Sequence, residues 1–376
     1  MTKITSKKNK ILIVGSFPKS NQKKIFGGQL TACKILINSK FSKKYRIYTL
    51  NSSFFTNPPP NLLIRSLFAG SRLLKFIYKI IINQPQIIII FVADKLSAIE
   101  KGLLILVAKT FNKKVMIFPR AGALINQYMK NKIFKSLIKF TFSRSDIFLS
   151  QGKSFQKFAV EELKFSKLNA PVIPNWTSSS VYLSIGNNRK YQARNIIPKI
   201  LFIGWLEEFK GVREILASAL ILKQKGYKFK LLLAGDGSYK KNAIEFIKNN
   251  KLDKYITLLG WIDKKKKNKI LKEADIFLLP SWNEGFPNAL IEAMSAGLAG
   301  IVSSVGTIPD FLTNEHNILL VRPKITEDIV LSIERLLNDY QLRKKIAQNG
   351  YLYAKANFTV DNGLELLSKE IKKLAT

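Results

Sequence analysis

The sequence predicts an α/β protein with two domains, and three features carry this prediction. The chain has 376 residues, more than a single hydrophobic core usually serves. Hydrophobic residues make up 47% of it, enough for two cores. Short isoleucine-rich runs alternate with lysine-rich segments along its length, a pattern typical of parallel strands joined by crossover helices. We therefore expect two Rossmann-like domains, each built on a parallel sheet.

Residues 1–180 contain the elements of the first domain. Its strands are short apolar runs, expected at Lys10–Phe17, Tyr45–Leu50, Ile87–Val92, Lys114–Phe118, Ile147–Ser150 and Pro171–Pro174. Helices fill the gaps between them, notably at Gln29–Asn38, Leu96–Phe111 and Lys130–Phe142.

Residues 181–357 repeat the alternation and form the second domain. A polar stretch, Asn175–Ile197, is the expected linker between the two. The strands that follow it are expected at Lys199–Gly204, Phe229–Ala234, Ile256–Leu259, Asp275–Leu279 and Gly300–Ser303. Residues 358–376 are predicted to form a final helix.

Composition narrows the setting of the protein. A single cysteine, Cys33, allows no internal disulfide and favours a reducing compartment. The basic N-terminus has no apolar core of the signal-peptide type, because Ile11–Val14 is only strand length. The most apolar stretch, Ile77–Val92, is interrupted by Asn83–Gln86, so we expect a helix and a strand there and no membrane span.

The net charge of +37 favours anionic partners such as nucleic acid, anionic lipid or phosphorylated substrates. A lysine-rich surface that reflects biased genome composition is the alternative. The best local candidate for a docking segment has Arg65, Arg72, Lys75 and Lys79 at near-helical spacing among leucines. It is either a basic amphipathic helix that lies on a membrane or a buried helix with a solvated basic face.

The segment Ser281–Gly297 has the most specific pattern in the sequence. A short apolar strand ends at Pro280, just before it. Pro287 is expected in the first turn of the following helix, where its missing N–H costs nothing. Gly297 is expected to end that helix in a left-handed cap. The free amides at the start of the helix predict an anion site.

Two carboxylates bracket this helix start. Glu284 lies just before the helix and Glu292 about a turn and a half inside it. Such carboxylates are suited to accept hydrogen bonds from sugar hydroxyls while the amides hold the charged group. Most pairs at this spacing are simply solvated carboxylates, but the residues between these two favour a binding role.

The run from Glu284 to Met294 resembles the nucleotide-sugar motif of the family 4 glycosyltransferases. The resemblance implies the GT-B architecture, in which two Rossmann-like domains face each other across a cleft and the last helix often crosses back to the first domain. It also implies retaining transfer from a nucleotide diphosphate sugar. Glu284 would orient the donor sugar and Glu292 would hold the ribose hydroxyls. Further substrate contacts would come from Gly285, Phe286, Pro287 and Asn288.

Three other segments of the second domain resemble family loops. Gly204–Gly211 is similar to a Gly-Arg…Lys-Gly loop whose two cations bind the donor diphosphate. Lys210 matches the lysine, but Trp205 replaces the expected arginine, which weakens diphosphate binding unless another basic residue enters the cleft. Gly235 belongs to a matching glycine turn. Trp261 and Ile262 are expected near the nucleotide base, although a core role for Trp261 is an open alternative.

In the first domain, Gly27 and Gly28 resemble a glycine pair near the diphosphate and acceptor; an ordinary helix start is the alternative. Arg120 follows a strand where many relatives carry histidine. Its guanidinium cannot act as a base, so we expect it to neutralise leaving-group charge or to bind an anionic acceptor. The single histidine, His316, is expected to be structural. No cluster of metal ligands is evident, and the resemblance implies that neither a metal nor a cofactor is needed.

We therefore expect a transferase that moves a sugar to a glycan or polyprenyl-linked acceptor in bacterial surface polysaccharide assembly, with no specific nucleic acid as partner. It would work in the cytoplasm, peripherally at the anionic inner face of the membrane. The alternatives are a nucleotide-sugar epimerase or hydrolase of the same fold, and a non-catalytic protein that binds a membrane surface or nucleic acid.

Overall fold

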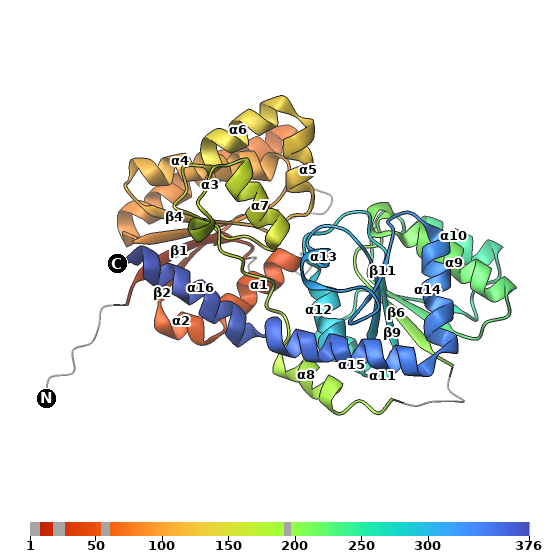
Figure 1. Ribbon diagram of the computed structural model, residues 1–376. Helices are drawn as coiled ribbons and strands as arrows, with labels where there is room; N and C mark the ends of the chain where they lie inside the picture. The colour runs from red at the N-terminus through yellow and green to blue at the C-terminus, as the bar shows by residue number, and fades with distance from the viewer. Residues whose placement is uncertain (1–7, 18–26, 54–60, 192–196, 376) are drawn as a thin grey trace, which may run out of the picture. The chain divides into compact units, whose positions relative to one another are not determined.

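The computed structural model describes residues 8–17, 27–53, 61–191 and 197–375 (Figure 1). The chain forms two compact units, Met1–Trp176 with Asp361–Thr376, and Thr177–Val360. These divisions lie within four residues of the boundaries expected at 180 and 357. Residues 1–7 of the basic N-terminus and residues 192–196 of the expected linker lie outside the described ranges.

The first unit contains a five-stranded parallel sheet in the order β2-β1-β3-β4-β5. The strands are β1 Lys10–Gly15, β2 Arg46–Asn51, β3 Ile87–Val92, β4 Lys114–Pro119 and β5 Ile147–Phe148. Every residue of β3 is buried, as expected for a central parallel strand covered by helices on both faces. This burial explains why β3 is a continuous apolar run without alternation.

The helices of the first unit come from two separate parts of the chain. They are α1 Gly28–Ile37, α2 Lys40–Lys44, α3 Leu62–Asn83, α4 Leu96–Thr110, α5 Ala123–Lys130, α6 Lys132–Phe142, α7 Lys153–Glu161 and, coloured blue in Figure 1, α16 Val360–Ala375. The helix α16 joins this unit from residue 361 onward. Its Gly363 lies against Trp176, where an added Cβ would come within 2.5 Å of the indole side chain.

The second unit contains a six-stranded sheet in the order β11-β10-β9-β6-β7-β8, and all its pairs are parallel. The strands are β6 Lys199–Ile203, β7 Lys230–Ala234, β8 Ile256–Gly260, β9 Ile276–Leu279, β10 Ala299–Ser303 and β11 Leu319–Val321. The chain moves outward from β6 through β7 to β8, then returns to the other side of β6 with β9.

The helices of the second unit are α8 Ser180–Asn187, α9 Val212–Gln224, α10 Lys240–Asn249, α11 Lys264–Glu273, α12 Asn288–Ser295, α13 Ile308–Phe311, α14 Thr326–Asn338 and α15 Tyr340–Asn357. Arg189 holds the end of α8 in place. Its guanidinium donates to the carbonyls of Ala296 at 2.8 Å and Ala274 at 2.7 Å, so one side chain caps the ends of α12 and α11.

The expected helix Lys130–Phe142 is α6, which begins at Lys132 because the Asn131 side chain accepts from the amide of Phe134 at 2.9 Å and caps its start. Two other sequence predictions about these elements are wrong. Pro171–Pro174 is no strand and contributes one bridge, from Val172 to Ser150. The expected linker contains α8, whose Tyr182 and Gly186 are buried.

The apolar stretch Ile77–Val92 divides as predicted, since α3 ends at Asn83 and β3 begins at Ile87. In the described part of the chain, no helix is both long enough and apolar enough to cross a membrane. The exposed hydrophobic residues of α3 belong to a helix that also carries arginine and lysine.

Candidate functional site

The sheet order of the second unit marks a position for a ligand. Because β7 and β9 lie on opposite sides of β6, the chain leaves the carboxyl ends of β6 and β9 in opposite directions. In open parallel sheets such a switch point leaves a crevice that ligands occupy. The loop after β6 carries Lys210 and the loop after β9 carries Glu284.

Lys210 and Glu284 meet at this switch point. The Nζ atom of Lys210 lies 2.6 Å from Oε1 of Glu284, and the Ser281 hydroxyl donates to the same oxygen at 2.8 Å. The two charged side chains are 16% and 10% exposed, so this ion pair is shielded from most solvent and is stronger than a surface pair. The structure thus brings together Lys210 and Glu284, which the sequence analysis expected to contact the donor diphosphate and the donor sugar.

Backbone contacts hold the two loops in register. The amide of Trp282 donates to the carbonyl of Phe209 at 2.8 Å. Gly211 has φ +74°, and an added Cβ would lie 2.3 Å from the Pro280 carbonyl oxygen. Only glycine satisfies both conditions, which explains why a glycine follows Lys210.

A third loop, after β10, packs against the backbone of Glu284 and Gly285. An added Cβ on Gly306, which has φ +61°, would lie 2.0 Å from the carbonyl oxygen of Glu284. The Thr307 amide donates to the Gly285 carbonyl at 3.0 Å. The position of the Glu284 carboxylate is therefore set by the backbone of neighbouring loops and not by its own loop alone.

The helix α12 begins beside Glu284, one residue later than predicted. Pro287 is its N-cap residue, with φ −73° and ψ 125°, and Asn288 is the first helical residue. Phe286 turns inward and packs against Phe311 and Phe358, with ring centroids 4.9 Å apart in each pair. Gly297 has φ +74° and ends the helix in the predicted left-handed cap. The start of α12 thus lies at the carboxyl edge of the sheet, as expected.

Glu292 lies inside α12 and is only 6% exposed. Its Oε2 atom is 2.9 Å from Nζ of Lys267 on α11, and that ammonium lies 5.3 Å from the ring centre of Tyr182 on α8. Burial raises the pKa of Glu292, and the ammonium of Lys267 opposes this effect only in part. Burial by itself would lower the pKa of Lys267, but Glu292 and Tyr182 raise it. The carboxylate therefore depends on Lys267 for its charge.

Trp205 occupies the position of the expected arginine for a packing reason. Its indole meets that of Trp261 edge to face, with ring centroids 4.6 Å apart. Between them, Gly235 has φ +155°, and an added Cβ would lie 1.8 Å from the Gly204 carbonyl oxygen. Trp261 is 39% exposed and Ile262 is partly buried against the core, so an indole pair lines the loops after β6 and β8.

The glycine pair of the first unit marks the start of α1. Gly27 is the N-cap, with φ 157°, and Gly28 is the first residue of the helix. An added Cβ on Gly27 would meet no atom within 4 Å, so conformation and not crowding favours glycine there.

Arg120 follows β4 and lies in an aromatic cage. Its guanidinium carbon is 4.3 Å, 4.5 Å and 5.7 Å from the ring centres of Phe118, Trp176 and Phe91. The Nε and Nη2 atoms are buried without a hydrogen-bond partner among the described residues, and burial lowers the pKa of the guanidinium to about 9. Two donors held ready beside aromatic faces are suited to an anion.

Asp94 was not predicted as a site residue. It follows β3, the strand next to β4. Its Oδ1 atom is buried and has no hydrogen-bond partner within the described ranges. Burial raises the pKa of the carboxyl to about 6. An acid with these properties at the carboxyl edge of a sheet is a candidate for a functional site, and only the Asp-Lys dipeptide at the end of an apolar strand could have signalled it.

We expect Asp94→Asn to stabilise the protein at pH 8 by about 1–3 kcal/mol and by about half as much at pH 5. The folded protein keeps the carboxyl proton of Asp94 up to a pH of about 6, whereas the unfolded chain loses it above a pH of about 3.9. The free energy of unfolding of the wild type therefore falls as the pH rises from about 3.9 to about 6. Above this range the loss of stability is complete. Urea unfolding at both pH values measures the difference.

Asp146 provides the matched control, because its carboxylate accepts from Lys109 Nζ and from the Val115 amide, both at 2.7 Å. Asp146→Asn should destabilise the protein at pH 8. Equal stability of wild type and Asp94→Asn at both pH values would contradict the burial of an ionised Asp94.

Among the described residues, no group of three or more histidine, cysteine or carboxylate side chains is placed to hold a metal ion. His316 lies in a loop, where its backbone carbonyl accepts from the Asn349 side chain at 2.9 Å.

Residues 187–353, nearly all of the second unit, match the model of the family described as glycosyl transferases group 1. This part of the chain is therefore similar to that family. An uncharacterized glycosyltransferase of Methanocaldococcus jannaschii is 30% identical to this protein over 43% of the chain. The N,N'-diacetylbacillosaminyl-diphospho-undecaprenol alpha-1,3-N-acetylgalactosaminyltransferase of Campylobacter jejuni is 25% identical over 66% of it. The chain spans 42% and 66% of the lengths of these two relatives.

The protein also resembles solved structures over nearly its whole length. The Anabaena protein HepE, solved in complex with UDP, superposes with a TM-score of 0.72 over 97% of this chain and all of its own, at 14% identity. At that identity the likeness concerns the fold alone. The two Rossmann-like α/β units are those of the GT-B fold, as the sequence predicted.

Proposed function

We propose that this protein is a retaining glycosyltransferase that moves a sugar from a nucleotide diphosphate sugar to a glycan or lipid-linked acceptor. The observation that carries the proposal is the shielded pair of Lys210 and Glu284, 2.6 Å apart at the switch point of the second sheet. The match of residues 187–353 to the model of the glycosyl transferases group 1 family and the start of α12 beside this pair support it. No acid–base or nucleophilic set of another kind lies at this edge in the described residues.

The chemical task is to stabilise a departing diphosphate. As the bond from the anomeric carbon to the phosphate oxygen lengthens, negative charge grows on the phosphates and the sugar gains oxocarbenium character. Lys210 and the amides at the start of α12 would hold that charge. Glu284, released from its ion pair when phosphate takes Lys210, would accept hydrogen bonds from the donor sugar.

We assign no side chain among the described residues of the switch point as a covalent nucleophile, and we propose attack by the acceptor on the face that the diphosphate leaves. The acceptor oxygen bonds to the anomeric carbon, the carbon–oxygen bond to the phosphate breaks, and the acceptor proton passes to a phosphate oxygen. Glu292 would bind the ribose hydroxyls, and its charge would be maintained by Lys267, 2.9 Å away. The indoles of Trp205 and Trp261 would lie near the base.

We propose that the acceptor binds at the carboxyl edge of the first sheet. There the unpaired donors of Arg120 suit a phosphate or other anion, and Asp94 suits a sugar hydroxyl. The name of the Campylobacter jejuni relative specifies a diphospho-undecaprenol acceptor, which contains both groups. A bacterial surface polysaccharide pathway at the inner face of the membrane would supply such an acceptor.

The experiment is a product analysis with a panel of nucleotide diphosphate sugars and polyprenyl diphosphate-linked acceptors. Transfer predicts a glycosylated lipid whose new bond has the anomeric configuration of the donor. Release of free sugar or of an isomerised donor without acceptor product would instead identify a hydrolase or epimerase of this fold. Inversion of the anomeric configuration would contradict the retaining mechanism.

A further inference from the structure

We propose that the first half of α3 inserts into the surface of an anionic lipid bilayer. Residues 62–71 form three turns of helix, and none of them is buried. Leu62, Leu63 and Leu67 are 62%, 72% and 68% exposed. Within the described residues, a helix segment that exposes its leucines and buries no residue leaves an apolar surface uncovered.

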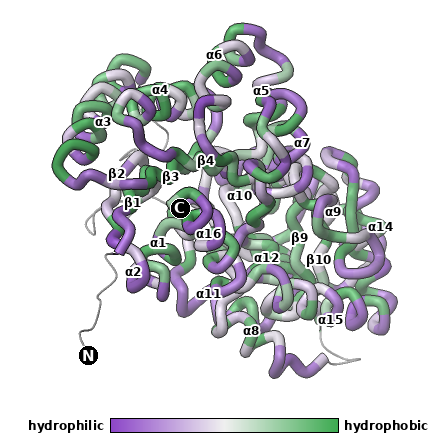
Figure 2. The backbone as a smooth tube through the Cα atoms, turned by 60° about the vertical axis from the view of Figure 1, so that its left-hand side comes forward, coloured by the Kyte–Doolittle hydropathy of each residue, from purple (hydrophilic) through white to green (hydrophobic). Residues whose placement is uncertain are grey.

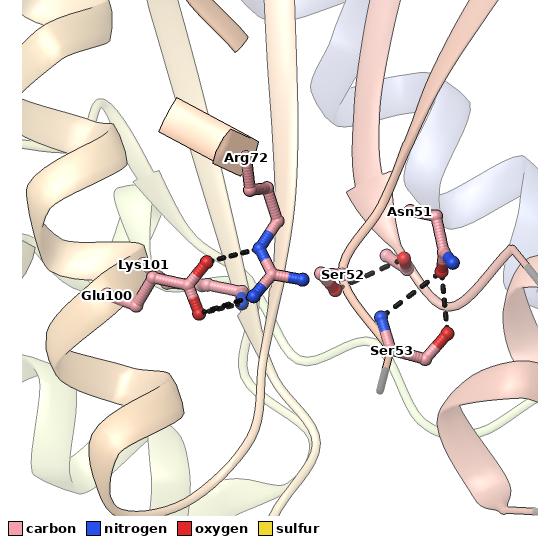
Figure 3. A network of polar contacts seen from close by, with 7 residues as sticks. Asn51, Ser52, Ser53, Arg72, Glu100 and Lys101 are labelled. Atoms are coloured by element: carbon pink, nitrogen blue, oxygen red, sulfur yellow. Dashed lines mark hydrogen bonds and ion pairs between the residues drawn. The ribbon is translucent and has the colours of Figure 1, made fainter. Parts of the chain in front are cut away.

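The second half of α3 anchors the helix to the unit. Phe76 and Ile80 are buried in the core, and Arg72 pairs with Glu100 of α4, whose other oxygen accepts from Lys101 at 3.0 Å (Figure 3). Arg72 was predicted to belong to the basic face of this helix. The prediction is wrong for this residue, because its side chain is buried and only 6% exposed. The helix is therefore fixed at one end and apolar at the other.

The neighbouring helices α4 and α6 also expose apolar residues. A groove of about 270 Å³ runs between α3 and α4, with Leu62, Leu73 and Leu103 among its lining residues. On its other side α4 packs against α6, which exposes Ile133, Leu137 and Phe140. Figure 2 shows hydrophobic and hydrophilic residues alternating along α3. We call the exposed apolar residues of α3 and α6 the lipid face.

Charge identifies the occupant of the lipid face as an anionic surface. Residues 1–93 contain no aspartate or glutamate. Residues 1–176 contain 31 lysines and arginines against five acids: Asp94, Glu100, Asp146, Glu161 and Glu162. A second copy of the chain would bring like charges together, and nucleic acid could not bury aliphatic leucines. A bilayer with anionic headgroups accommodates both the charge and the apolar side chains.

The test is flotation of the full chain with vesicles of phosphatidylglycerol and phosphatidylcholine. We expect binding that weakens with salt. Leu63→Ser/Leu67→Ser should lower the partition coefficient at least about tenfold, and Lys75→Gln should lower it about fivefold. The matched control, Leu331→Ser/Leu352→Ser, changes leucines of the second unit that are 56% and 59% exposed, and it should float like wild type.

Equal flotation of Leu63→Ser/Leu67→Ser and wild type would overturn the proposal, as would equal loss in the control. Equal binding to pure phosphatidylcholine would overturn its electrostatic part. If the same leucine variant instead converts a dimer to a monomer, the occupant is a second copy; if wild type binds RNA in preference to vesicles, it is nucleic acid. Flotation needs no donor, so Glu284→Gln should float normally even if the transferase proposal fails.

Discussion

Replacing Lys210 with alanine is expected to lower kcat/KM for sugar transfer by about 10²- to 10³-fold, the usual effect of removing one charged group that stabilises a transition state. Lys210 lies at the switch point and contacts Glu284 at 2.6 Å. In the proposed mechanism, the substitution removes a cation that binds the donor diphosphate. The carboxylate of Glu284, no longer paired, would then repel the diphosphate. Steady-state kinetics with donor and acceptor varied separately measures the effect.

The matched control for this prediction is Lys225→Ala. Lys225 also forms an ion pair, with Glu334 at 2.8 Å, but it caps the far end of α9 and lies away from the carboxyl edge. We expect its kcat/KM to stay within twofold of wild type. Thermal unfolding of both variants checks the fold. Transfer by Lys210→Ala at the rate of the control would remove Lys210 from the mechanism.

Lys267→Met is expected to be the most destabilising single substitution in the candidate site, by about 3–5 kcal/mol at pH 7. This is the usual cost of leaving one partner of a buried ion pair uncompensated. Glu292 is 6% exposed and contacts Lys267 at 2.9 Å. Without the ammonium, the carboxylate must either stay charged in an apolar environment or take up a proton. Urea unfolding measures the loss.

The pH dependence of this loss identifies its cause. Burial already raises the pKa of Glu292, and removal of Lys267 should raise it further. The folded variant then keeps a proton that the unfolded chain releases above about pH 4.3, so the stability of the variant relative to wild type falls as pH rises and recovers on acidification.

Two further variants complete this test. Lys267→Met/Glu292→Met removes both charges and should regain most of the lost stability, while Lys267→Arg should keep both stability and donor binding. A Lys267→Met variant whose deficit is the same at pH 5 and pH 8, or whose double variant is no more stable, would show that the lysine acts by packing alone.

Much of the fold could be predicted because its strands are continuous apolar runs. The run Ile87–Val92 is β3 to the residue, since a strand buried on both faces must be apolar throughout. The predictions failed where tertiary contacts decide the local structure. The helix α8 is held by Arg189 and by packing on α12, which local composition does not encode.

The site was predictable only in part, for a similar reason. The spacing of Glu284 and Glu292 and the position of Lys210 are visible in the sequence, but their ion pairs depend on how the sheet orders its strands. The ion pair of Glu292 with Lys267 joins two helices, and the two residues are 25 positions apart in the sequence. Asp94 was missed because its significance is its burial, and Arg72 was misassigned because its partner, Glu100, lies on another helix.

Calorimetric titration of the wild type and of Lys210→Ala with UDP-sugars and other nucleotide diphosphate sugars tests the central claim most directly. The claim is that the carboxyl edge of the second sheet binds the diphosphate of an activated sugar. It predicts saturable binding of at least one donor to wild type, with affinity at least tenfold weaker for Lys210→Ala and for the matching nucleoside monophosphate. Donor binding of equal affinity to wild type and Lys210→Ala, or no binding of any nucleotide diphosphate sugar, would contradict it.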